Sequence, residues 1–263
     1  MSTIRLLEEP IAREAAKNPK GRARHQTRIM IRVRKSEDRG HADHGWLNSY
    51  HTFSFASYYD PEHMGFRSLR VINEDRVAPG RGFGSHGHRD MEILSYVLKG
   101  SLAHQDSMGH QEVLGPNEIQ RMSAGTGVMH SEFNPSGTDP VHFFQIWLEP
   151  ATTGTPSSYE QIRFDPAEKK GKLKLLAAPD GGPGVARINQ NAQVFVAELA
   201  EGDEIAYPLS PQRHAWIHVI RGAVTLNGNT LTTGDAAAVD AEEKLVLTGA
   251  KAEPSEILLF NLA

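Results

Sequence analysis

The sequence predicts an all-β protein built from two consecutive β-barrels. From residue 29 onward, short apolar segments of about four to seven residues alternate with turns rich in Gly, Pro, Asn and Asp. A polar stretch from residue 152 to about residue 182 divides these segments into two sets. Many short strands without helical patterns between them favour a sandwich or barrel over a fold of alternating strands and helices.

The expected strands follow one another along the whole chain after the first 28 residues. They are residues 29–33, 68–73, 92–98, 119–122, 143–147, 193–198, 215–221, 223–226, 230–231, 245–247 and 257–261. Residues 92–100 also parallel residues 214–222 in length, in several apolar positions and in a final basic residue followed by glycine. A duplicated barrel accounts for this faint repeat.

Four parts of the chain are therefore expected. A basic arm at residues 1–28 carries seven Lys or Arg against three acids, and it is interpreted as a solvated arm or as a segment that docks on a partner chain. The N-terminal barrel is expected at residues 29–157 and the C-terminal barrel at residues 183–263. Residues 158–182 form the connecting segment.

Composition excludes several classes of function. The chain has no cysteine among its 263 residues, which excludes disulfides, thiolate nucleophiles and cysteine-ligated metals. Any transition metal must then be held by carboxylates and by some of the 13 histidines. The net charge of −4 gives no reason to expect direct nucleic-acid binding. Without a signal-type N-terminus or an apolar run of about 20 residues, we expect a cytoplasmic protein that has no membrane partner.

Two clusters of possible metal ligands stand out, each after a glycine-rich approach. His86 and His88 are two residues apart, as are His130 and Glu132. Residues i and i+2 of a strand project to the same face, so each pair points in one direction. If the two strands are neighbours, the four side chains can converge on one ion. The residues alone therefore predict a site of three imidazoles and one carboxylate.

The same clusters resemble a known family. The spacing of His86, His88 and Glu92 resembles the first cupin motif, and the spacing of Gly127, His130 and Asn134 resembles the second. The finer resemblance is to bacterial pirin-like proteins, and it runs from about residue 29 to the C-terminus. It is carried by residues 39–55, 86–92, 104–109 and 122–132.

The resemblance implies a bicupin fold, in which two antiparallel barrels of the jelly-roll (double-stranded β-helix) type are stacked. It places one mononuclear metal in the N-terminal barrel, with His86, His88, His130 and Glu132 as ligands. Many other cupins use the glutamate of the first motif instead, which here is Glu92.

The remaining polar residues near the motifs have less specific interpretations. Asp90 and Glu92 are left as candidates for outer-shell or structural roles. His104 is interpreted either as a residue that orients a metal ligand or the substrate, or as a hydrogen-bonded strand histidine. The C-terminal barrel is expected to be free of metal, because Pro208 and Ser210 stand where His86 and His88 stand in the first barrel.

The resemblance also implies an activity. It suggests a dioxygenase of the quercetin 2,3-dioxygenase type, which acts on a flavonol-like phenolic substrate with dioxygen and in which Glu132 accepts the substrate's hydroxyl proton. Fe(II) is the ion that it implies first, while the ligand types also suit Cu, Mn, Ni or Zn. The alternative is a non-enzymatic regulatory protein whose iron redox state controls binding of a protein partner. A metal-dependent isomerase or hydrolase is a third possibility.

Overall fold

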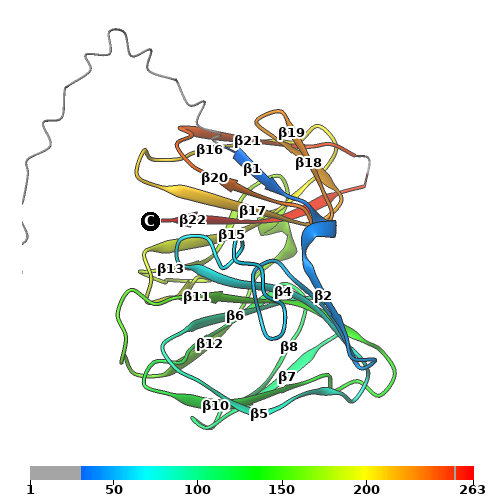
Figure 1. Ribbon diagram of the computed structural model, residues 1–263, viewed down its shortest axis with the longest axis vertical. Coiled ribbons are helices and arrows are strands. Elements are labelled where there is room, and N and C mark those ends of the chain that lie inside the picture. The colour runs from blue at the N-terminus through cyan, green and yellow to red at the C-terminus, as the bar shows by residue number, and fades with distance from the viewer. Residues whose placement is uncertain (1–30, 252) are drawn as a thin grey trace, which may run out of the picture.

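The computed structural model describes residues 31–251 and 253–263, so the expected basic arm at residues 1–28 lies outside the described part. Four β-sheets are stacked in layers along the long axis of the molecule (Figure 1). Each barrel contains one seven-stranded and one four-stranded sheet. The structure thereby confirms the predicted all-β fold of two stacked barrels.

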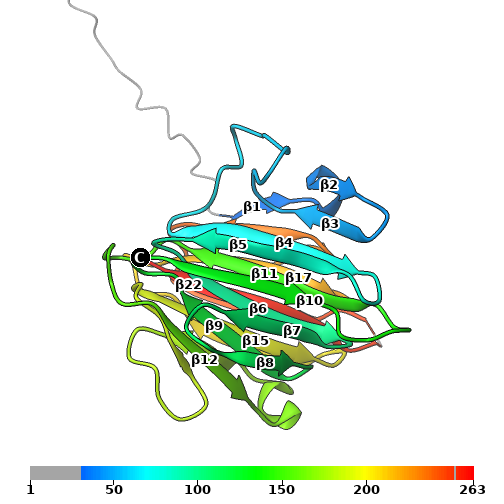
Figure 2. The same ribbon diagram turned by 90° about the horizontal axis from the view of Figure 1, so that it is seen from below.

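The N-terminal barrel is formed by two sheets that face each other. Its seven-stranded sheet runs in the order β12 (Ser158–Arg163), β9 (Glu118–Ser123), β6 (Glu92–Lys99), β11 (Val141–Leu148), β4 (Leu69–Val77), β3 (Leu47–His51) and β2 (Gly40–Asp43). Its four-stranded sheet, in front in Figure 2, runs in the order β5 (Gly82–His88), β10 (Val128–Phe133), β7 (Leu102–Asp106) and β8 (Gln111–Leu114).

The C-terminal barrel repeats this arrangement. Its seven-stranded sheet runs in the order β1 (Ile31–Arg34), β20 (Ala236–Val239), β17 (His214–Arg221), β22 (Ser255–Leu262), β15 (Ala192–Leu199), β13 (Lys174–Ala178) and β14 (Ala186–Arg187). Its four-stranded sheet runs in the order β16 (Glu204–Pro208), β21 (Lys244–Gly249), β18 (Ala223–Leu226) and β19 (Asn229–Thr232). The 3₁₀ helices η1 (Ser36–Asp38) and η2 (Pro166–Lys169) are single turns.

Two strands lie in a different part of the fold from the one that the sequence suggests. β1 was expected to open the N-terminal barrel, but it pairs with β20 at the edge of the C-terminal sheet. β12 falls in the expected connecting segment, yet it pairs with β9 at the edge of the N-terminal sheet. Alternation of apolar residues identifies a strand but not the sheet edge that it joins, which depends on contacts far away in the sequence.

The largest core lies between the two barrels, where the seven-stranded sheets pack face to face. Leu94, Phe144 and Ile146 of the N-terminal sheet meet Trp216 and Phe260 of the C-terminal sheet in one buried cluster. Each occupies an alternate position of its strand, as expected for a sheet with two different faces. Burial of each such side chain contributes about 1.5–3 kcal/mol to stability.

The interiors of the two barrels differ in polarity. The C-terminal barrel is filled by one cluster of aliphatic side chains, which includes Ile217, Leu245 and Leu259. The apolar residues inside the N-terminal barrel form two smaller clusters. Buried polar residues also occupy this half, among them Ser95 and Gln145. A barrel that replaces part of its core with polar groups gives up stability, which points to the N-terminal barrel as the functional one.

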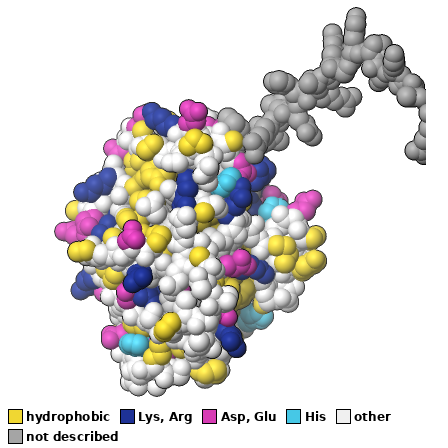
Figure 3. Space-filling model, turned by 90° about the vertical axis from the view of Figure 1, so that its left-hand side faces the viewer, with side chains coloured by type: hydrophobic (Ala, Val, Ile, Leu, Met, Phe, Trp, Pro, Cys, Tyr) yellow, Lys and Arg dark blue, Asp and Glu magenta, His cyan; other side chains and the backbone are white. Residues whose placement is uncertain are grey.

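Charged side chains of both signs are interspersed over the face shown in Figure 3. Within the described residues, the structure contains no helix with the length and apolar character that a membrane span requires.

His218 makes the stability of the fold depend on pH. Its side chain is completely buried on β17, and neither ring nitrogen has a hydrogen-bond partner among the described residues. Burial lowers the pKa of His218 to about 3; the positive charge of Arg39 acts in the same direction, while Glu74 and Asp235 oppose it. The folded state therefore disfavours the proton, whereas the unfolded chain binds it below about pH 6.5.

We expect His218→Leu to remove this pH dependence. The free energy of unfolding of the unsubstituted protein should fall by about 1.4 kcal/mol for each pH unit below about 6.5, in addition to the contributions of other groups. The variant should not show this additional fall in the free energy of unfolding at low pH. At pH 7.5 it should be no less stable than the unsubstituted protein, because no hydrogen bond is lost. Urea denaturation at pH 7.5 and pH 5.0 measures the difference, with the exposed His41→Leu as the control. Parallel loss of stability in all three proteins would contradict the assignment.

Candidate metal centre

The two predicted ligand pairs lie on neighbouring strands of the four-stranded sheet. β5 carries His86 and His88, β10 carries His130 and Glu132, and the antiparallel register sets His130 opposite His86. The alternating burial of β10 turns His130 and Glu132 toward the barrel interior. A β-bulge between these two residues shifts the register against β5. On its other side, β10 pairs with β7, where Glu132 lies opposite His104.

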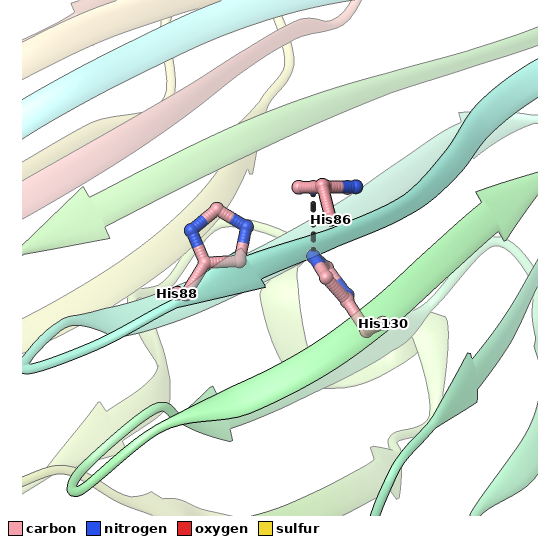
Figure 4. Close-up of side chains that lie close together, drawn as sticks. All are labelled: His86, His88 and His130. Carbon is pink, nitrogen blue, oxygen red and sulfur yellow. Dashed lines mark hydrogen bonds between the residues drawn. The ribbon is translucent and has the colours of Figure 1, made fainter.

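Three imidazoles converge at this place (Figure 4). The ring centroids are separated by 4.8 Å for His86 and His88, 4.4 Å for His86 and His130, and 4.8 Å for His88 and His130. The Nε2 atoms of His86 and His130 lie 3.0 Å apart. One nitrogen from each ring lies within 4.8 Å of the other two, which is close enough for one ion to bridge all three after small side-chain movements.

The ring of His86 is oriented by the backbone. Its Nδ1 atom lies 2.8 Å from the carbonyl oxygen of Gly84, which accepts the N–H hydrogen bond. This contact leaves the lone pair on Nε2, the atom that faces Nε2 of His130 in the cluster. A histidine that binds a metal usually has its second nitrogen held in this way.

Glu132 lies next to His130 but belongs to a second, overlapping group. Together with His104 and His130, its carboxylate forms a trio whose possible ligand atoms lie within 4.8 Å of one another. Gln145 Nε2 donates a hydrogen bond to Glu132 Oε2 at 2.7 Å, and Ser95 Oγ lies 3.3 Å from Glu132 Oε1. The structure thus brings His86, His88 and His130 together directly, and it places Glu132 on the inner side of His130.

The electrostatics of the cluster favour neutral imidazoles. Burial lowers the pKa of His88 to about 4, and the charge of His86 contributes to the shift. Burial lowers the pKa of His130 to about 3, assisted by His86, His88 and His104. Metal binding requires the unprotonated ring, so at pH 7 these two histidines are in the binding form. Burial also raises the pKa of Glu132 to about 7, and the nearby carboxyl of Asp75 adds to this shift.

The other two acids considered from the sequence point elsewhere. Glu92 lies on β6, where its carboxylate accepts hydrogen bonds from Ser123 Oγ at 2.7 Å and from Asn189 Nδ2 at 3.0 Å. Asn189 belongs to the C-terminal half, so Glu92 faces the interface between the barrels. The Asp90 carboxylate accepts a hydrogen bond from the backbone N–H of Gly154 at 2.6 Å and fixes a loop.

Three further residues beside the cluster were not found from the sequence. Ser95 and Gln145 hold the Glu132 carboxylate, and Trp147 stands edge-on to His88 with ring centroids 4.9 Å apart. Ser95 and Gln145 each interrupt an apolar run, in residues 93–97 and 143–148. A polar residue in the middle of a core strand is the signal that could have found them.

The residues present fit a divalent transition metal. Three imidazoles converge beside one buried carboxylate, and neutral nitrogen and carboxylate oxygen ligands suit Fe, Mn, Co, Ni, Cu or Zn. If His86, His88, His130 and Glu132 held one ion, they would leave room on it for small molecules, which is typical of a reactive site rather than a structural one. Both groups of candidate ligands found among the described residues lie in the N-terminal barrel.

The paired barrels and the histidine cluster define a cupin-type protein with a candidate metal centre in its first barrel. Comparison with known proteins specifies the family. The Pirin family model matches residues 32–148, and the model of the quercetinase C-terminal cupin domain matches residues 175–262. The chain belongs to the pirin family.

Close relatives are similar over nearly their whole length. Quercetin 2,3-dioxygenase from Escherichia coli strain K12 is 46% identical over 233 residues, which cover 89% of this chain and 99% of the relative. The crystal structure of YhhW from Escherichia coli is 45% identical, with a TM-score of 0.85, and the match covers 89% of this chain and 98% of that one. A second crystal structure, of the bacterial pirin YhhW in complex with nickel(II), has a TM-score of 0.84 at 45% identity, covering 89% and 99%.

Proposed function

We propose that the protein is a metal-dependent dioxygenase that opens the heterocyclic ring of a flavonol-like phenolic substrate. One divalent ion per chain is held by His86, His88, His130 and Glu132. The observation that carries this proposal is the convergence of three neutral imidazoles beside a buried carboxylate inside a polar barrel. Relatives that are 46% identical over most of the chain and bear the name quercetin 2,3-dioxygenase support it.

Each residue of the site has a separate task. When bound, the ion supplies Lewis acidity toward the substrate oxygen and redox chemistry with dioxygen. Glu132, a buried carboxylate beside the cluster, accepts the proton of the substrate hydroxyl. Gln145 and Ser95 hold the carboxylate in place for this transfer.

The neighbouring aromatic residues suit a flat substrate. Trp147 makes edge-on contacts with both His88 and Phe55, with ring centroids 4.9 Å and 5.4 Å apart. Aromatic rings in edge-on contact give an apolar wall that can pack against a polyphenol. The partners expected are therefore the phenolic substrate and dioxygen.

Fe(II) is the ion that we propose first, because it combines nitrogen and carboxylate ligation with dioxygen chemistry. The nickel(II) complex of the homologous YhhW keeps Ni among the candidates, together with Cu, Mn and Zn. Elemental analysis of the protein as purified, with reconstitution of the metal-free form by each ion, identifies the one that supports turnover.

The test of the activity is oxygen uptake with quercetin. We expect dioxygen consumption and carbon monoxide release in equal amounts, because both oxygen atoms enter the product as one ring carbon leaves. His86→Ala is the control, since it removes one ligand from the cluster. Equal rates in the variant and the unsubstituted protein would mean that loosely bound metal performs the reaction. A regulatory role, with partner binding set by the redox state of the iron, would then replace the enzymatic one.

A further inference from the structure

His104 has the environment of a metal ligand, although the set of ligands proposed above does not include it. Its ring is buried on β7, and Nε2 lies 3.2 Å from Oδ2 of Asp106, whose side chain is fully buried. Asp106 also accepts hydrogen bonds from the backbone N–H groups of Met108 and His110, at 2.8 Å and 3.1 Å. The carboxylate is therefore fixed in place before it orients the imidazole.

This hydrogen bond determines which nitrogen of His104 is free. With Nε2–H donated to Asp106, the lone pair is on Nδ1, and that atom is buried without a hydrogen-bond partner among the described residues. A histidine with one nitrogen bonded to a carboxylate and the other free is the usual arrangement of a metal-binding imidazole. A buried nitrogen with no partner also costs free energy unless a ligand satisfies it.

His104 has two possible co-ligands nearby. His104 lies opposite Glu132 in the pairing of β7 with β10, and its ring centroid is 5.3 Å from that of His130. The ligand atoms of His104, His130 and Glu132 lie within 4.8 Å of one another, and all three side chains are buried. They form a second trio that shares His130 with the outer trio of His86, His88 and His130.

We propose that the metal centre has an inner coordination position, formed by His104, His130 and Glu132, next to the outer position of the three clustered histidines. One ion occupies either position, because His130 belongs to both. The inference rests on the metal centre of the proposed function and adds His104 as a ligand.

The test removes the outer position and asks whether an ion still binds. The double variant His86→Ala/His88→Ala retains the inner trio, and we expect it to bind one Co²⁺ per chain, about a hundredfold or more weaker than the unsubstituted protein. Adding His104→Phe to the double variant should abolish this binding. Phenylalanine preserves the ring that stacks on Tyr159, with centroids 4.9 Å apart, but it has no nitrogen. His104→Gln serves as a second substitution if the phenylalanine variant does not fold.

Co²⁺ binding is measured by equilibrium dialysis and by visible absorption, and folding by the thermal midpoint without metal. His110→Ala in the double variant is the matched control, because His110 also contacts Asp106 and stacks on Tyr159 but is partly exposed. The control should bind Co²⁺ as the double variant does. Absence of Co²⁺ from the double variant, or equal binding with and without His104, would overturn the inner position.

The readout separates this inference from the proposed function. An unsubstituted protein that binds no Co²⁺ would overturn both the metal centre and the inner position. If the double variant binds Co²⁺ through His104 while the unsubstituted protein shows no oxygen uptake with quercetin, the inner position stands and the proposed activity fails.

Discussion

Replacing His130 with alanine is expected to abolish metal binding by the protein. His130 lies 3.0 Å from His86 between Nε2 atoms, and of the three clustered histidines it is the one that also groups with Glu132. Loss of an outer-shell partner typically weakens a metal site by 10–100-fold, so loss of this ligand should cost more than about a hundredfold. Oxygen uptake with quercetin should fall to the background of free metal.

His51→Ala is the matched control for this experiment. His51 is a buried histidine of β3 and belongs to neither group of candidate ligands. Both variants leave a cavity of similar size, so both should lose stability, while only His130→Ala should lose metal. Elemental analysis after dialysis, with thermal denaturation in parallel, measures the two effects. Full metal content in His130→Ala would refute the assignment of the cluster.

Glu132→Gln and Glu92→Gln are expected to differ in their effect on metal binding. Glu132 is next to His130, so its loss should weaken metal binding and remove the group that accepts the substrate proton. Glu92 faces Ser123 and Asn189, so its replacement should leave the metal in place and cost about 1–3 kcal/mol through a disturbed buried hydrogen bond. Retention of metal in the Glu132 variant and its loss in the Glu92 variant would identify Glu92 as the ligand.

Glu132→Gln should also stabilise the metal-free protein at alkaline pH. Burial raises the pKa of Glu132 to about 7, so the folded metal-free state resists ionisation of a carboxyl that ionises near pH 4.5 when unfolded. Stability is therefore lost as the pH rises from about 4.5 to 7, by up to about 3 kcal/mol. Glutamine does not ionise and should regain this amount at pH 8. Urea denaturation in the presence of a chelator measures it.

Much of the site could be predicted because strand geometry is local. The two-residue spacing within each pair predicts that His86 and His88 share a face, as do His130 and Glu132, and this requires only a strand. That the two strands are neighbours depends on the closure of the barrel, which the resemblance to a family supplied. Glu132 lies opposite His104 because β10 pairs with β7, and nothing in the local sequence indicates that pairing.

The residue Glu92 shows where counting along a strand fails. It lies four positions after His88, so a continuous strand would turn both to the same side. The chain instead leaves β5 after His88 and makes a turn in which Asp90 has a φ of 49°, and β6 begins at Glu92 in a different sheet. Because the turn interrupts the strand, the alternation of inward and outward side chains does not continue from His88 to Glu92. Glu92 therefore faces the other barrel. Ser95 and Gln145 interrupt apolar runs in the sequence, but their contact with Glu132 depends on how the strands pair.

Stepwise reconstitution with Fe(II) tests the central claim most directly. Metal-free protein is loaded anaerobically with increasing amounts of Fe(II), and the initial rate of quercetin-dependent oxygen uptake is measured at each step. A single centre at His86, His88, His130 and Glu132 predicts a rate that rises in proportion to bound iron and stops rising at one equivalent per chain. The account would be contradicted by a rate that does not depend on the amount of bound iron. A rate that keeps rising as free iron is added beyond one equivalent would also contradict it.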